Sequence, residues 1–301
     1  MIEYIGNVKM NYNFYNGQDS YSDGEIEDEL LKVLLDQKDI SQLLQEDNRW
    51  PTLYHFSPNR HNLLEWFSFK PESDVLEIGS GCGAITGLLC EKSKSVTCIE
   101  LSKKRSLINA HRHLEKSNLE IIVGNLNEIK LEKKYDYVTL IGVLEYAALY
   151  TETESPYISF LENARKYIKE GGVLIIAIEN KLGLKYWAGS REDHTGQFFD
   201  GLQNYPSKRK VATFSNLELE ALVREAGYKD AQFYYPYPDY KMPTQIYSDN
   251  RLPVVGELKG NSPNYDQNRV LLFDEESVMD NLIRNQLFPT FSNSFLVFCS
   301  N

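Results

Sequence analysis

A glycine-rich turn between an apolar strand and a helix is the part of this sequence best suited to bind a small molecule. The turn lies in the segment 75–84, which reads VLEIGSGCGA. Glycines let the backbone turn tightly and approach a ligand with no Cβ in the way, and the start of the following helix offers free N–H groups. The segment therefore predicts a site for a ligand that contains a nucleoside.

Two fingerprints fit this turn equally well. Gly79, Gly81 and Ala84 satisfy the G-x-G-x-x-G/A pattern of dinucleotide-binding proteins. Glu77 followed by Gly79, Gly81 and Gly83 satisfies the E-x-G-x-G-x-G turn that holds S-adenosylmethionine. The turn alone does not choose between NAD and S-adenosylmethionine, so the ends of the neighbouring strands have to decide.

Polar residues at the ends of the next predicted strands favour S-adenosylmethionine. Glu100 ends the second strand, where a carboxylate can accept both ribose hydroxyls of either cofactor. Asn125 directly follows the third strand and is a small polar residue placed to face an adenine. The fourth strand runs into a turn that begins at Gly142 and is suited to pass the methionine moiety. A dinucleotide site requires neither of the last two features.

Strands and helices alternate from residue 74 onward, which predicts a doubly wound α/β fold with a parallel sheet covered by helices on both faces. A helix over 157–170 is expected to stop at a glycine pair, and Ser215 is a plausible N-cap for a helix that ends at Gly227. The predicted strands are 74–79, 95–101, 119–124, 135–143, 171–179, 231–238 and 294–300.

The run from Val75 to Asn180 resembles a class I S-adenosylmethionine-dependent methyltransferase, with the motifs in order. The resemblance implies a Rossmann-like seven-stranded sheet in the order 3-2-1-4-5-7-6, S-adenosylmethionine as cofactor and S-adenosylhomocysteine as product. It puts Glu77 and the glycines at the methionine end and Glu100 at the ribose. Asn125, where the family often has Asp, flanks the adenine. The full set of predicted cofactor-binding residues is Glu77, Gly79, Ser80, Gly81, Gly83, Glu100, Leu101, Asn125, Leu126, Gly142 and Arg60.

Flanking segments such as SPNRHNLLEW, LIGVLEYA and AIENKLGLKYWAGSREDHTGQFFDG resemble a bacterial methyltransferase group found with cell-surface polysaccharide biosynthesis, sometimes fused to glycosyltransferases. This likeness implies O-methylation of a sugar, a nucleotide-sugar or a lipid-linked glycan, with a glycosyltransferase as a candidate partner. Two alternatives stay open: use of the cofactor for a reaction other than methylation, and a cofactor-binding module that serves a glycosyltransferase.

Methyl transfer to an alcohol needs a group that removes the hydroxyl proton. His194 is the first candidate for this base, with Glu192 or Asp193 beside it as the orienting carboxylate, and Glu179 at the end of the fifth strand is the second. A surface loop histidine is the alternative explanation for His194. Arg60 could hold the cofactor carboxylate or an acceptor phosphate, or could cap a helix.

Aromatic and polar residues near the carboxyl ends of strands four and five, and in a later aromatic run, could contact the acceptor. Rings stack on sugar faces, although packing in the core explains most such rings more simply. The candidates for acceptor binding are Glu145, Tyr146, Asn180, Tyr186, Trp187 and Tyr237.

The net charge, the lengths of the apolar runs and the spacing of the cysteines limit the possible partners, location and metal sites. The 301 residues carry a formal charge of -11, which disfavours a nucleic-acid partner. No apolar run is long enough to span a bilayer, so we expect a cytoplasmic protein, at most peripheral to the inner membrane face. The four cysteines lack a C-x-x-C pair and predict buried thiols rather than a metal site.

The segments outside the regular alternation of strands and helices predict an N-terminal cover and two insertions in the methyltransferase domain. Residues 1–24 are polar and predict a loose arm, and 26–44 predicts one amphipathic helix. Connections much longer than about six residues usually carry function. The resulting bounds are 1–70 for the arm and helical lid, 71–301 for the methyltransferase domain, and about 181–214 and 238–290 for its insertions.

Overall fold

The computed structural model describes residues 1–19, 21–22, 24–207, 210–259 and 269–301. The chain divides into two compact units. The first unit holds residues 1–140 and 164–173, and the second holds residues 141–163 and 174–301. The first unit thus combines the predicted arm and lid with residues 71–140 and 164–173 of the predicted methyltransferase domain.

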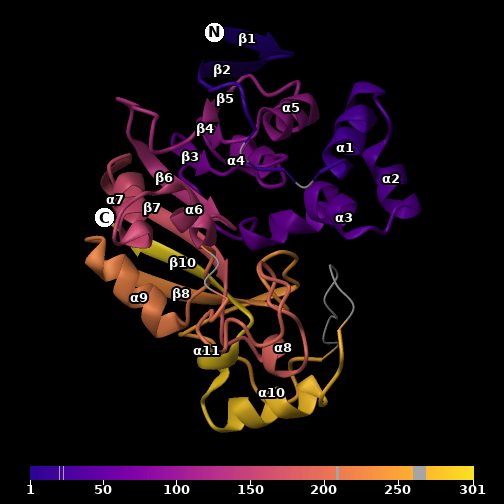
Figure 1. Cartoon of the computed structure of the whole chain (residues 1–301), viewed down its shortest axis with the longest axis vertical. Helices are drawn as coiled ribbons and strands as arrows, with labels where there is room; N and C mark the ends of the chain where they lie inside the picture. Colours follow the sequence, from indigo (N-terminus) through magenta and orange to yellow (C-terminus); the bar gives the residue numbers. More distant parts are fainter. Residues whose placement is uncertain (20, 23, 208–209, 260–268) are drawn as a thin grey trace. The chain divides into compact units, whose positions relative to one another are not determined.

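The first unit is built on six strands in the order β1-β2-β5-β4-β3-β6 (Figure 1). All neighbouring pairs from β2 to β6 are parallel, and β1 pairs antiparallel with β2. The strands are β1 (Ile2–Ile5), β2 (Val8–Phe14), β3 (Asp74–Ile78), β4 (Ser95–Glu100), β5 (Leu119–Gly124) and β6 (Tyr135–Ile141). Its helices are α1 (Ile26–Leu35), α2 (Ile40–Glu46), α3 (Trp50–Phe56), the 3-10 helix η1 (Pro58–Leu63), α4 (Thr86–Lys92) and α5 (Lys103–Arg112).

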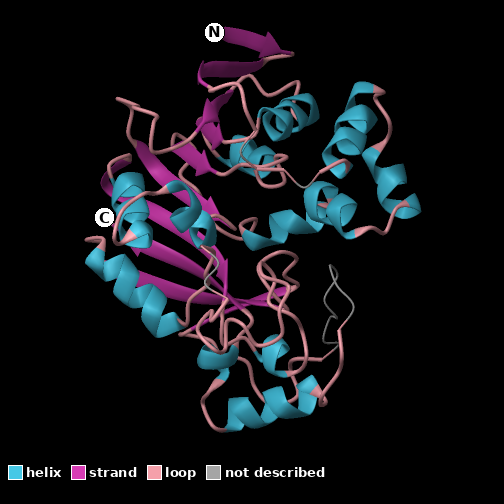
Figure 2. Ribbon diagram, viewed as in Figure 1, coloured by secondary structure: helices cyan, strands magenta, loops and turns pink. Residues whose placement is uncertain are grey.

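The second unit is built on four strands in the order β7-β10-β8-β9. β8 pairs antiparallel with both β10 and β9. The strands are β7 (Ile168–Glu179), whose first half belongs to the first unit, β8 (Asp230–Tyr237), β9 (Gln245–Ser248) and β10 (Ser294–Ser300). The helices are η2 (Leu144–Tyr146), α6 (Ala147–Tyr150), α7 (Pro156–Arg165), α8 (Leu184–Trp187), α9 (Asn216–Glu225), α10 (Glu275–Arg284) and α11 (Phe288–Phe291), joined by long loops (Figure 2).

The α/β class is confirmed and each of the seven predicted strands is present, but the described residues form ten strands of mixed direction, so the exact seven-strand order is not confirmed. The added strands are β1, β2 and β9. The first part of the predicted loose arm, residues 2–14, forms the β1-β2 hairpin, in which Val8, Met10 and Tyr12 are buried on one face. This alternation with a period of two is a strand signal that the polar composition of the arm obscures.

Two predicted helix boundaries are also wrong. The helix expected over 26–44 is two helices, because Gln37 adopts a left-handed conformation with φ 52° and Asp39 caps the second helix. The helix expected over 157–170 ends at Arg165, and the glycine pair lies within β7. The predicted Ser215 cap is confirmed: Ser215 and Glu218 form a reciprocal capping box at the start of α9.

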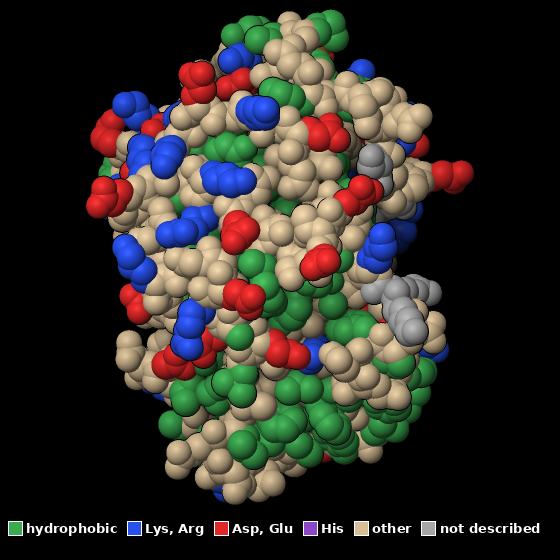
Figure 3. All heavy atoms as spheres, turned by 60° about the vertical axis from the view of Figure 1, so that its left-hand side comes forward, with side chains coloured by type: hydrophobic (Ala, Val, Ile, Leu, Met, Phe, Trp, Pro, Cys, Tyr) green, Lys and Arg blue, Asp and Glu red, His purple; other side chains and the backbone are tan. Residues whose placement is uncertain are grey.

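No helix in the described part of the chain is long and apolar enough to cross a bilayer. All four cysteines are free and buried, as the sequence predicts. On the face drawn in Figure 3, Lys and Arg side chains are interspersed with Asp and Glu and do not gather into one basic patch. A continuous basic surface is the usual footprint of nucleic-acid binding.

Candidate functional site

The glycine turn joins β3 to α4, and its geometry explains why glycines occupy three of its positions. Gly79, Gly81 and Gly83 have φ values of 72°, 53° and 79°. This left-handed region costs a residue with a Cβ roughly 1 kcal/mol or more. The turn therefore depends on these glycines for its backbone path as well as for access to a ligand.

The space beside the turn fits a bound cofactor. A Cβ added to Gly81 would meet no atom closer than 4.0 Å, whereas a Cβ on Gly83 would lie 2.3 Å from the Asn109 side chain. Gly83 is thus required for packing against α5, while Gly81 borders open space. The buried Ser80 hydroxyl has no hydrogen-bond partner among the described residues and is available to a ligand.

Glu100 is fixed beside the same turn at the end of β4. Its Oε2 accepts a hydrogen bond from the Gly81 N–H at 2.8 Å, and its Oε1 accepts one from the Ser102 N–H at 3.0 Å. Burial raises the pKa of Glu100, and the Arg105 charge with these N–H donors opposes the rise. Each carboxylate oxygen keeps a lone pair, so the group can still accept two ribose hydroxyls.

Glu77 faces the interior of the first unit and joins three elements there. Its Oε2 accepts hydrogen bonds from the Thr86 hydroxyl at 2.6 Å and the Cys98 thiol at 3.3 Å. Burial raises the pKa of Glu77 to about 7, although these hydrogen bonds lower it. Its observed contacts thus tie β3 to α4 and β4.

Stability should therefore fall as pH rises from about 4.5 to about 7, because the folded state holds the Glu77 proton over a range in which the unfolded chain releases it. Glu77→Gln removes this cost, and we expect it to stabilise the protein at pH 8 by on the order of 2 kcal/mol, with little effect at pH 4. Calorimetric melting at both pH values measures the difference. Glu72→Gln, at a largely exposed carboxylate, is the control. An equal gain at both pH values would contradict the assignment.

The end of β5 and the segment before β3 hold the other predicted cofactor residues of the first unit. Asn125 is half-buried and accepts a hydrogen bond from the Asn127 N–H at 3.0 Å, next to the buried Leu126. Leu101 is half-buried after β4. Arg60 lies in η1 and is buried, with its guanidinium 4.4 Å from the centre of the Tyr54 ring. These contacts leave the cofactor roles of all four residues as predictions.

The N-terminal cover is attached directly to the start of α5, which the sequence did not reveal. Asp19 accepts hydrogen bonds from the N–H groups of Lys103 and Lys104 at 2.7 and 3.2 Å and thereby caps α5. Glu27 of α1 forms a buried ion pair with Arg105 at 2.6 Å. No motif marks Asp19 or Glu27, because their partners lie more than 70 residues away.

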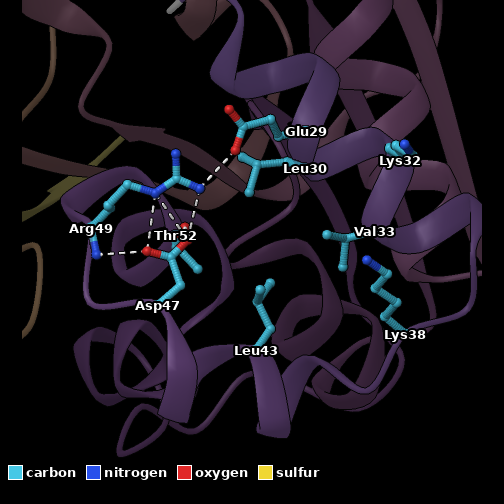
Figure 4. Close-up of a pocket in the computed structure, with 9 residues that line it drawn as sticks. All are labelled: Glu29, Leu30, Lys32, Val33, Lys38, Leu43, Asp47, Arg49 and Thr52. Carbon is cyan, nitrogen blue, oxygen red and sulfur yellow. Dashed lines mark hydrogen bonds and ion pairs between the residues drawn. The ribbon is translucent and has the colours of Figure 1, made fainter.

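The cover also packs on the glycine turn. Leu30 of α1 and Phe56 of α3 form one apolar cluster with Cys82 of the turn and Ile108 of α5. A pocket of about 280 Å³ lies among α1, α2 and α3 (Figure 4). Arg49 lines this pocket and forms ion pairs with Glu29 and Asp47. None of the residues predicted to bind the cofactor lines this pocket.

A second cluster of functional side chains lies within the second unit. It joins Glu145 of η2, Glu179 at the end of β7 and His194 of the long loop after α8. His194 Nε2 lies 3.5 Å from Glu145 Oε1 and 3.8 Å from Glu179 Oε2, and all three side chains are almost completely buried. The structure thus brings together two predicted catalytic residues, His194 and Glu179, and the predicted acceptor residue Glu145.

Of the two carboxylates that the sequence offered as partners of His194, Glu192 contacts the imidazole and Asp193 pairs with lysines. His194 Nδ1 lies 3.0 Å from Glu192 Oε1, and Glu192 Oε2 accepts the N–H groups of His194 and Thr195 at 2.8 and 2.6 Å. Burial lowers the pKa of His194, but the carboxylates of Glu179, Glu145 and Glu192 outweigh it and hold this pKa well above its usual range.

Asp193 points instead to two lysines. It accepts Lys185 Nζ at 2.8 Å and Lys241 Nζ at 2.6 Å. Burial raises the pKa of Asp193, and the two lysines more than reverse the rise and hold it below its usual range. Lys241 also lies 2.7 Å from Glu179 Oε1. No sequence motif marks Lys241, which is 47 positions from His194.

The remaining predicted residues of the second unit have varied surroundings. The Tyr146 ring packs edge-on against His194 at 5.3 Å, and a Cβ on Gly142 would lie 2.9 Å from the Tyr240 hydroxyl. Asn180 donates to the carbonyls of Thr290 and Ser292, which is a structural role. The other three residues are Tyr186 and Tyr237, both buried, and Trp187, which is 43% exposed.

One family model matches part of the chain. Residues 76–174 match the family model described as a methyltransferase domain. These residues contain the glycine turn and the ends of β4, β5 and β6. This part of the chain is therefore similar to a methyltransferase domain, and the match supports S-adenosylmethionine as the cofactor over NAD.

The similarity to individual curated relatives extends over only part of the chain. The small-subunit ribosomal RNA methyltransferase A of Wigglesworthia glossinidia brevipalpis is 27% identical over 167 residues, which are 54% of this chain and 60% of that protein. The malonyl-[acyl-carrier protein] O-methyltransferase of Priestia megaterium is 27% identical over 39% of this chain and 42% of its own. A possible histamine N-methyltransferase of Thermotoga maritima has a TM-score of 0.47 at 16% identity, covering 86% and 96% of the two chains. The chain thus spans less than two thirds of the length of the first two proteins, whose named substrates differ.

Proposed function

We propose that this protein transfers the methyl group of S-adenosylmethionine to a hydroxyl of a sugar, a nucleotide-sugar or a lipid-linked glycan during surface polysaccharide synthesis. In this reaction the bond from the methyl carbon to sulfur breaks and a bond to the acceptor oxygen forms. The sulfonium becomes the neutral thioether of S-adenosylhomocysteine, and the hydroxyl proton leaves to a base.

The observation that carries the alcohol acceptor is the buried cluster of Glu145, Glu179 and His194. An alcohol, unlike an amine with a free lone pair, requires a group that takes its proton, and such groups must be held within hydrogen-bond reach. The cluster supplies carboxylate oxygens that lack donors. Asp193, with two lysine partners, is the least available of the predicted catalytic residues.

The choice of a glycan rests on the resemblance of the flanking segments, and the aromatic rings of Tyr146 and Trp187 are compatible with it. Ribosomal RNA, the substrate named for one relative, is disfavoured by the formal charge of -11 and by the interspersed charges on the face in Figure 3. A glycosyltransferase partner and a location at the inner membrane face belong to the same proposal.

Mass spectrometry of surface polysaccharide from a strain that lacks the protein tests the acceptor. We expect the loss of a methyl increment of about 14 Da from one sugar, restored by the wild-type chain but not by its Glu100→Ala variant. An unchanged polysaccharide would overturn the glycan assignment. Calorimetry with S-adenosylhomocysteine and NAD tests the cofactor separately, and binding of NAD alone would overturn the whole proposal.

A further inference from the structure

The spacing of the donor atoms in the second unit suits a bound metal ion better than a hydrogen-bonded cluster. The separations of 3.5 and 3.8 Å from His194 Nε2 to Glu145 and Glu179 exceed the usual hydrogen-bond range. Two metal bonds of about 2.1 Å at 110–130° place their donor atoms about 3.4 to 3.8 Å apart. The three donor atoms all lie within 4.8 Å of one another.

Both carboxylates have buried oxygens that no donor satisfies. Glu145 Oε2 and Glu179 Oε2 lack a hydrogen-bond partner among the described residues, and each side chain is 1% exposed. Lys241 Nζ lies 2.7 Å from the other oxygen of Glu179, Oε1. A buried charged oxygen without a partner is costly, so these atoms are directed at something that supplies positive charge.

The charges of the cluster leave a deficit that a divalent ion would fill. Four carboxylates face two ammonium groups and the imidazole of His194, so the cluster keeps a net negative charge even when His194 holds its proton. The groups are Glu145, Glu179, Glu192, Asp193, Lys185 and Lys241.

His194 has the surroundings of a metal ligand. A metal-bound imidazole nearly always directs its second nitrogen to a carboxylate or carbonyl, which fixes the ring orientation. Here Nδ1 faces Glu192 at 3.0 Å, and Glu192 is itself held by two backbone N–H groups. The other nitrogen, Nε2, points to Glu145 and Glu179.

We propose that the protein binds one divalent first-row transition-metal ion through Glu145, Glu179 and His194, with Glu192 orienting the histidine. Mixed carboxylate and imidazole ligands suit Mn²⁺ and Zn²⁺ better than Ca²⁺. An ion at Nε2 makes His194 a ligand, so proton removal from an alcohol would pass to a carboxylate or to the polarising effect of the ion. The inference rests on the geometry of the second unit and not on the proposed acceptor.

Metal analysis of the full chain tests this site. After chelator treatment and dialysis against Mn²⁺ or Zn²⁺, we expect one ion per chain by mass spectrometry, and titration calorimetry should give a single site. Glu145→Gln and Glu179→Gln should each weaken binding at least tenfold, and Glu192→Gln about 10- to 100-fold. Glu152→Gln, at an exposed carboxylate of the same unit, should bind as the wild type does.

The wild-type chain decides the question even where a variant fails to fold. Absence of stoichiometric Mn²⁺ and Zn²⁺ from the wild type would overturn the metal site, and so would unchanged binding by a folded Glu145→Gln/Glu179→Gln double variant. S-adenosylhomocysteine binding measured on the same samples separates this outcome from a failure of the methyltransferase proposal.

Discussion

Replacing Glu100 by Ala should weaken S-adenosylhomocysteine binding by about 100-fold. The carboxylate is positioned beside the glycine turn by the N–H groups of Gly81 and Ser102. Its loss removes two charge-assisted hydrogen bonds to the ribose, each worth about 1.5 kcal/mol or more. Isothermal titration calorimetry of wild type and variant measures the change in Kd.

Two further variants make this test specific. Glu100→Gln keeps the size of the side chain and one acceptor oxygen, so its affinity should fall between those of wild type and Glu100→Ala. Glu91→Ala removes an exposed carboxylate of the same unit and should leave the affinity unchanged. If folded Glu100→Ala bound as tightly as the wild type, the ribose assignment would be wrong.

Glu27→Gln should destabilise the N-terminal cover by about 3 to 5 kcal/mol, because it removes one partner of a buried ion pair and leaves the other charge behind. Glu27 is completely buried, and the Arg105 side chain is 12% exposed. Chemical denaturation measures the free energy of unfolding, and hydrogen exchange in α1 shows whether the loss is local.

The neighbouring residue gives a matched control. Asp28 pairs with Lys104 at 2.7 Å, but its side chain is 65% exposed. Asp28→Asn should therefore change stability by less than about 1 kcal/mol. Equal effects of the two substitutions would show that the Glu27–Arg105 pair does not hold the cover to α5.

The sequence predicted the methyltransferase class and the glycine turn proposed to hold the cofactor, because both predictions depend on local chemistry. The positive φ angles of Gly79, Gly81 and Gly83 follow from a turn that few other residues can adopt. Glu100 follows from its position at the end of an apolar strand. The capping box at Ser215 is likewise local, since both of its partners lie within one helical turn.

Only the tertiary structure decided which distant residues meet. The hairpin at the N-terminus became a sheet edge because β2 pairs with β5, more than 100 positions away. Glu192 rather than Asp193 faces His194 because Asp193 is taken by Lys185 and Lys241, a competition that no local pattern encodes. The same long-range packing buries Glu145 and Glu179 with unsatisfied oxygens beside His194. The sequence thus predicted which polar residues stand at the ends of the strands. Which side chains they contact depends on burial and on charge pairing between residues far apart in the chain.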